Sequence, residues 1–142
     1  MLFTVVGAAA ILLGAQTAAQ AQTNGGSSSA GVAWVQQDTS TGYCQAEVKL
    51  DLGTTTYVYG SFVNQHAGLS CIGWLDRSTD GGSYWYTISG YHTVGSYSTA
   101  QYDATGDYWD GIGYLARACF RLNFAGSATH CSYGIGNYVH VG

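Results

Sequence analysis

The chain has 142 residues, of which only 8% are charged, and its formal net charge at neutral pH is −4. Its 4 lysines and arginines are too few for the clustered cationic surface on which nucleic-acid binding depends, so we expect no nucleic-acid partner. The same shortage of cations argues against adhesion to anionic lipid.

The first segment in chain order is apolar. Residues 2–15 carry no charge, and Ala19 and Ala21 supply the small side chains that signal peptidase recognises. This apolar run is too short to be a membrane span, which takes about 20 apolar residues. We therefore expect residues 1–21 to be a secretory signal peptide and the mature protein to be extracellular. The alternative is a partly buried N-terminal helix.

The next segment is rich in glycine and serine. Residues 22–30 contain no large apolar side chain that could be buried, which is typical of a flexible lead-in. The remaining chain is long enough for one domain with its own core and too short for two. We expect that single domain to occupy residues 31–142.

Residues 43–51 alternate between apolar and polar side chains, a period of two that predicts a half-buried strand. The apolar side holds Cys44, Ala46, Val48 and Leu50, and the polar side holds Gln45, Glu47, Lys49 and Asp51. Gly53 ends this run, and the β-branched and aromatic residues 55–63 predict a second strand.

Further runs with the same character are separated mostly by Gly, Asn, Asp or Ser. The further expected strands are 32–36, which precedes the two strands above, and 71–77, 84–89, 91–102, 112–123 and 129–133. No segment after the signal peptide shows a sustained apolar stripe with the helical period of 3.6 residues. The sequence therefore predicts an all-β domain, a small antiparallel sandwich or barrel.

Four cysteines in an exported chain predict two disulfides. Cys119 and Cys131 are equidistant from Ala125, so a turn at residues 124–126, with Gly126 in the left-handed conformation, would pair them across a hairpin. Cys44 and Cys71 then remain to join two other strands.

Residues 78–85, with the sequence STDGGSYW, resemble the Asp-box, S-x-D-x-G-x-T-W, of sialidases and other β-propeller proteins. Tyr84 stands here in place of the usual threonine. The resemblance implies a structural turn in which Ser78, Asp80, Gly82 and Trp85 stabilise one hairpin, and it implies no catalysis. A propeller would need several blades of about 40 residues each, so a single copy does not predict that fold.

A broader resemblance concerns the whole chain. The apolar N-terminus, together with residues 73–78 and 113–119, is similar in style to small exported proteins of filamentous actinobacteria. This resemblance implies export and β structure, and it carries over no active residue.

Candidate chemical groups are scattered along the chain. Asp103, Asp107 and Asp110 could hold calcium, although aspartate is also an ordinary residue of exposed turns. The histidines are far apart in the sequence and match no catalytic motif: His66, His92, His130 and His140. We expect no cofactor and favour a non-catalytic protein, and an active site assembled by folding is the alternative.

The remaining feature is aromatic. Alternation places Trp74 outside if Cys71 points inward, and Tyr57 and Tyr59 outside if Val58 points inward. We expect these three rings to share one outer face with Glu47 and Lys49, where they could contact a ligand. The alternative is that a second sheet covers them.

Three hypotheses of function follow. The first is a secreted, non-catalytic module that binds a cell-wall or environmental glycan through the outward aromatic rings. The second is a structural or assembly protein of a cell or spore surface, whose exposed strand edges pair between copies. The third is an exported antagonist, either a toxin or a protease inhibitor.

Overall fold

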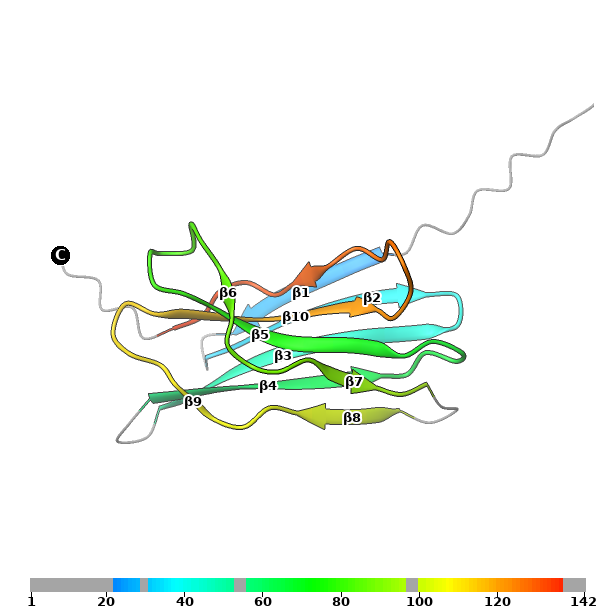
Figure 1. The fold of residues 1–142 in the computed structure, drawn as a ribbon, viewed down its shortest axis with the longest axis horizontal. Coiled ribbons are helices and arrows are strands. Elements are labelled where there is room, and N and C mark those ends of the chain that lie inside the picture. Colours follow the sequence, from blue (N-terminus) through cyan, green and yellow to red (C-terminus); the bar gives the residue numbers. More distant parts are fainter. Residues whose placement is uncertain (1–21, 29–30, 53–55, 97–99, 137–142) are drawn as a thin grey trace, which may run out of the picture.

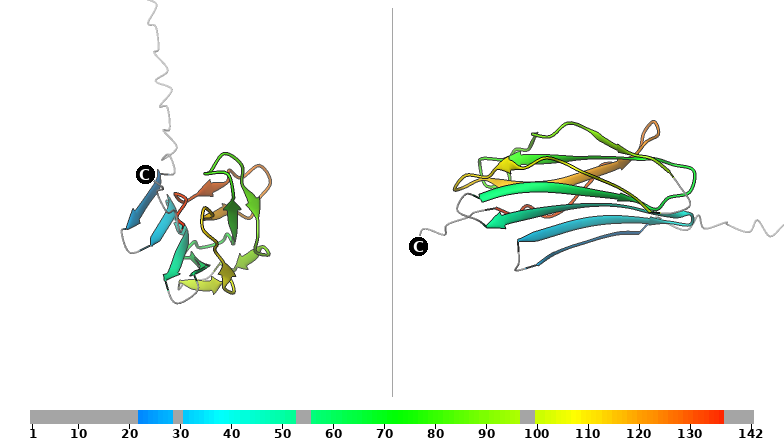
Figure 2. Two further views of the ribbon diagram at one scale, coloured as in Figure 1. Left: turned by 90° about the vertical axis from the view of Figure 1, so that its left-hand side faces the viewer. Right: turned by 90° about the horizontal axis from the view of Figure 1, so that it is seen from below.

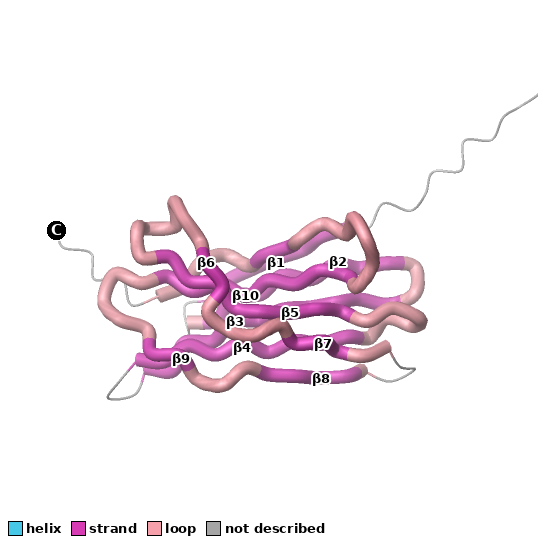
Figure 3. The backbone as a smooth tube through the Cα atoms, viewed as in Figure 1, coloured by secondary structure: helices cyan, strands magenta, loops and turns pink. Residues whose placement is uncertain are grey.

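The computed structural model describes residues 22–28, 31–52, 56–96 and 100–136 (Figure 1). The predicted signal peptide, residues 1–21, lies outside these residues. The regular structure of the described residues is entirely β-strand (Figure 3). Among the same residues, no helix has the length and apolar character needed to cross a bilayer.

The described strands form two antiparallel sheets. Sheet A has the order β1-β2-β3-β4-β8, with β9 also paired to β4. Its strands are β1 (Gln22–Ser28), β2 (Val32–Thr39), β3 (Gly42–Leu52), β4 (Thr56–Asn64), β8 (Gln101–Ala104) and β9 (Tyr108–Trp109). Sheet B has the order β11-β10-β5-β6, with β7 also paired to β5. Its strands are β5 (Cys71–Ser78), β6 (Tyr86–Thr87), β7 (His92–Val94), β10 (Leu115–Leu122) and β11 (His130–Cys131).

The two sheets pack face to face, and the end-on view in Figure 2 shows them as separate layers. The buried side chains between them include Val48, Val58, Phe62, Leu75 and Phe120. Gly73 is required at this interface, because a Cβ there would lie only 2.2 Å from the ring of Phe62. The predicted all-β sandwich is confirmed.

Both predicted disulfides are confirmed. Cys44–Cys71 joins β3 of sheet A to β5 of sheet B, and Cys119–Cys131 joins β10 to β11 within sheet B. Disulfides persist in oxidising compartments, so the two cross-links are compatible with an extracellular protein.

The prediction of a flexible lead-in is wrong for the described residues 22–28. They form β1, which pairs with β2 along its whole length, from Gln22 opposite Asp38 to Ser28 opposite Val32. An edge strand is held by backbone hydrogen bonds, which glycine and serine make as well as any other residue. A search for apolar side chains therefore does not detect it.

Two further predictions differ in detail. The segment 91–102 was expected to be one strand but forms β7 in sheet B and β8 in sheet A.

The Cys119–Cys131 register and the left-handed Gly126 (φ 80°) are confirmed. The connection is wider than three residues, because the amide of Leu122 donates to Oγ of Ser127 instead of continuing the ladder.

Candidate binding face

The outer side of sheet A is not covered by sheet B. In β4 the even-numbered residues point into the sandwich, with Val58 and Phe62 buried, so the odd-numbered residues point outward. Residues directly opposite each other in neighbouring strands share a face. The register therefore extends this outer side across β2, β3, β4 and β9, and we call it the open face.

Four of the aromatic rings on the open face follow one another across neighbouring strands. Tyr57 and Tyr59 project from β4, and Trp109 of β9 pairs with Tyr57. Trp34 of β2 pairs with Glu47 of β3. Tyr57 is 38% exposed and Trp109 is 55% exposed. We call Trp34, Tyr59, Tyr57 and Trp109 the aromatic track.

Two opposite charges at the centre of the open face are paired with each other, while Asp51, which lies on the same face opposite Tyr57, is exposed. Nζ of Lys49 lies 2.7 Å from Oε1 of Glu47, and Oγ of Ser61 donates to the same oxygen over 3.3 Å. The hydrogen bond to Glu47 raises the pKa of Lys49 above its ordinary value, and nearby Tyr59 contributes to the same direction. Between Trp34 and Tyr59 the face is therefore polar and electrically balanced.

Trp109 is held in place by contacts to both sheets. The Arg77 guanidinium of β5 donates to the backbone carbonyl of Trp109, and Arg77 also lies over the ring of Tyr114, 5.1 Å from its centroid. The rings of Trp109 and Tyr114 meet edge to face at 5.6 Å. Gly111 leaves space for the indole, because a Cβ there would come within 2.6 Å of it.

The prediction that Trp74 shares a face with Tyr57 and Tyr59 is wrong. β5 belongs to sheet B and β4 to sheet A, so their outer sides face away from each other. Trp74 does point out of the sandwich, but it is only 7% exposed. The ring of Tyr91 meets it edge to face at 5.4 Å, and the Cys119–Cys131 disulfide packs beside it.

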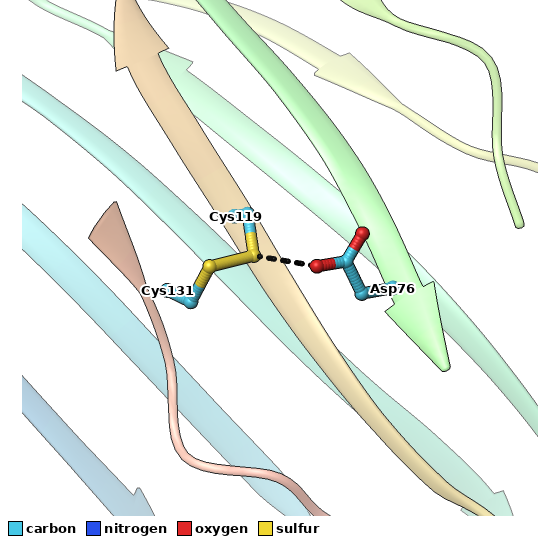
Figure 4. A group of neighbouring side chains, drawn as sticks. All are labelled: Asp76, Cys119 and Cys131. Carbon is cyan, nitrogen blue, oxygen red and sulfur yellow. Dashed lines mark hydrogen bonds between the residues drawn. A yellow bond between two sulfur atoms is a disulfide. The ribbon is translucent and has the colours of Figure 1, made fainter. Parts of the chain in front are cut away.

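A carboxylate lies against that disulfide. Figure 4 shows Asp76 of β5 pointing at Cys119, with Oδ2 of Asp76 3.4 Å from Sγ. Asp76, Cys119 and Cys131 are the one group of the described residues whose ligand atoms are close enough to share a metal ion. The two sulfurs are bonded to each other, so neither is a thiolate, which is the form of cysteine that binds metals.

The same carboxylate anchors Arg117 of β10. Nε and Nη2 of Arg117 lie 3.2 and 3.0 Å from Oδ2 of Asp76, and Thr87 donates to Oδ1 over 3.0 Å. The guanidinium also lies over the ring of Trp85, 4.3 Å from its centroid. Asp76 is thus committed to joining three strands of sheet B.

The turn that resembles an Asp-box makes a dense set of hydrogen bonds. Oδ1 of Asp80 accepts from the amides of Ser83 and Tyr84, each over 3.0 Å, and from Oγ of Ser78 over 2.7 Å. Oγ of Ser78 accepts from the amide of Gly82, and the indole of Trp85 donates to the Gly82 carbonyl. The Ser78 hydroxyl and the Tyr84 amide hold the pKa of Asp80 below its ordinary value.

The three aspartates considered for calcium do not form one group of potential ligands within the described residues. Asp103 lies in β8 and accepts from Nδ1 of His92 over 3.1 Å, Asp107 is exposed, and Asp110 is buried. Calcium binding by these residues stays a hypothesis, and the positions of their ligand atoms do not support it.

The histidines have separate surroundings. His66 contacts Oγ1 of Thr41, and its amide donates to Oδ1 of Asn64 over 2.7 Å. His130 packs against Phe120, and burial lowers the pKa of His130. His140 lies outside the described residues.

Two residues of the aromatic track were missed by sequence reasoning. Trp34 lies in a run that is apolar at four successive positions, so alternation assigns it to neither face. Trp109 lies between Asp107 and Asp110, and aspartates are ordinary residues of exposed turns, so the sequence does not indicate a strand there. The sequence carries one signal for the face on which these rings lie. Glu47 and Lys49 have opposite charges and are two residues apart in a strand, so they share a face and indicate that it is the outer one.

No family model, no curated protein and no solved structure matches this chain. Its function must therefore be argued from its own geometry.

Proposed function

We propose that this protein is a secreted, non-catalytic module that binds a neutral polysaccharide, and that the open face is its binding surface. The observation that carries the proposal is the aromatic track, a row of rings on the outer side of sheet A, two of them exposed, beside the paired charges of Glu47 and Lys49. The proposal keeps Tyr57 and Tyr59 as ligand-binding residues, as expected from the sequence, and leaves Trp74 out because that ring is only 7% exposed.

The rings support a sugar ligand because aromatic side chains are amphipathic contact surfaces. A sugar ring can lay its C–H face on tyrosine or tryptophan while its hydroxyls bond to polar neighbours. On the open face those neighbours are the Ser61 hydroxyl and the Glu47–Lys49 pair. Because the charge at the centre of the face is balanced, the surface favours an uncharged polymer over a polyanion.

Strand β1 supports a second candidate function, assembly between copies of this chain. β1 is the terminal strand of sheet A, and its sequence, QTNGGSS, lacks the charges and prolines that commonly protect an edge. An unprotected edge can pair with another strand. A surface or structural protein would use this edge, and the open face would then be incidental.

Pull-down on insoluble neutral polysaccharides, namely cellulose, chitin and xylan, tests the first proposal. We expect the parent protein to be retained by at least one of them. Tyr57→Ala and Tyr59→Ala should each weaken binding about tenfold, which corresponds to about 1.4 kcal/mol.

The matched control is Tyr84→Ala, because Tyr84 is 69% exposed but lies on the turn of sheet B. This variant should bind as the parent does. A parent that is retained by none of the three polymers rules out the glycan proposal. Concentration-dependent oligomers in the same preparation would then favour assembly, and inhibition of growth or of a protease would favour an antagonist.

A further inference from the structure

Trp34 occupies the far end of the aromatic track. Lys49 pairs with Tyr59 across β3 and β4, and the next outward pair along those strands is Glu47 with Ser61. Trp34 lies opposite Glu47 on β2. The track therefore crosses sheet A diagonally, from Trp109 on β9 to Trp34 on β2.

The position of the Trp34 indole is set by a glycine in β1. Gly26 lies directly opposite Trp34, and a Cβ on Gly26 would lie 3.1 Å from Nε1 and 3.3 Å from Cε2 of the indole. The ring therefore occupies the space that a side chain on β1 would take. A glycine here lets the tryptophan lie low over the edge strand instead of standing up from the sheet.

The two ends of the track are well separated. Trp109 and Trp34 are three strand spacings apart across the sheet and four residues apart along it. At about 4.8 Å per strand and about 3.3 Å per residue, these steps place the two ends about 20 Å apart. One sugar ring, or two, cannot reach both ends, whereas an extended chain of several rings can.

The middle of the track offers hydrogen bonds instead of rings. Lys49, Glu47 and Ser61 lie between Tyr59 and Trp34, and Lys49 and Ser61 both bond to the Glu47 carboxylate. A ligand that crosses this stretch must present hydroxyls to it and return to an aromatic contact at Trp34. A linear, uncharged polysaccharide has that chemistry.

We infer that the open face binds an extended chain of several sugar rings, and that Trp34, positioned by Gly26, is a distal subsite that selects for chain length. This inference rests on the proposed function. It adds a requirement for chain length and assigns separate roles to Trp34 and Gly26.

Calorimetric titration with cello-, chito- and xylo-oligosaccharides, from the disaccharide to the hexasaccharide, tests this inference. The parent should bind the hexasaccharide at least about tenfold more tightly than the disaccharide, a difference of about 1.4 kcal/mol. Trp34→Ala should remove that difference and leave disaccharide binding unchanged. Gly26→Val, which keeps every ring but displaces the indole, should change binding in the same direction.

The control is Tyr102→Ala, because Tyr102 lies on the same face opposite Val63, is 73% exposed and is not on the track. It should titrate as the parent does. If Trp34→Ala fails to fold, Gly26→Val alone decides. Affinity that does not depend on chain length, or a Gly26→Val variant with parental length dependence, overturns the inference and leaves the proposed function intact. A parent that binds no oligosaccharide and no polymer overturns the proposed function itself.

Discussion

The outer sides of the two sheets carry the same residue types but use them differently. On sheet B, Trp74 lies between Tyr91 and the Cys119–Cys131 disulfide, and Trp85 lies under Arg117. On the open face of sheet A, Trp34 lies over Gly26 of β1, Trp109 lies over Gly111 in the connection after β9, and Glu47 pairs with Lys49.

This contrast separates the direction of a side chain from its exposure. An outward aromatic ring is available to a ligand only where the chain does not fold back over it. On sheet B, Tyr91 and the Cys119–Cys131 disulfide pack against Trp74 and Arg117 lies over Trp85, so these rings are part of the fold.

The largest expected effect is on the outer side of sheet B, which we call the covered face. Trp74→Ala should lower the free energy of unfolding by about 3–5 kcal/mol, because it removes a buried indole and leaves a cavity beside the disulfide. Urea unfolding measures this change. Tyr59→Ala is the matched substitution on the open face and should stay within about 1 kcal/mol of the parent. Equal stability losses in the two variants would abolish the distinction between the faces.

The disulfide on the covered face should come next. Replacing Cys119 and Cys131 together by alanine should lower the free energy of unfolding by about 3 kcal/mol, because the cross-link restricts the unfolded chain and a loop of this length contributes about that much. The polysaccharide pull-down should not change for the protein that remains folded. Replacing Cys44 and Cys71 is the comparison, because their sequence separation is 27 instead of 12. If loss of the Cys119–Cys131 bond removes binding from folded protein, the covered face belongs to the site after all.

The smallest expected effect concerns the Asp-box turn and depends on pH. The depressed pKa of Asp80 means that its stabilising contribution is complete above pH of about 3.8 and is lost as the pH falls through the lower, folded-state value. Asp80→Asn should therefore melt at a lower temperature than the parent at neutral pH, and the difference should shrink in acid. Thermal melts across this range measure it, with Asp107→Asn as an exposed control. A difference that persists unchanged in acid would show that the carboxylate charge is not its cause.

The sequence was sufficient to predict most of the local structure. Alternation from Cys44 to Leu50 identified β3 and its inward face, and the symmetric spacing about Ala125 identified the Cys119–Cys131 register. These features depend on neighbours in the chain or on one hairpin. Local pattern carries that information.

The candidate site could be predicted only in part, because alternation orders side chains relative to their own sheet. It placed Tyr57 and Trp74 outside correctly but could not show that β4 and β5 lie in different sheets. It also could not find β1, whose pairing depends on backbone groups, nor the contact of Gly26 with Trp34 across that pairing. Both depend on which strands become neighbours.

The chain's 4 tryptophans allow the most direct test, since each indole N–H gives its own signal in a two-dimensional NMR spectrum. Trp34 and Trp109 lie on the open face, and Trp74 and Trp85 lie on the outer side of sheet B. On titration with a hexasaccharide of the polymer that retains the protein, we expect the signals of Trp34 and Trp109 to move and those of Trp74 and Trp85 to stay in place. Movement confined to Trp74 and Trp85 would contradict this expectation.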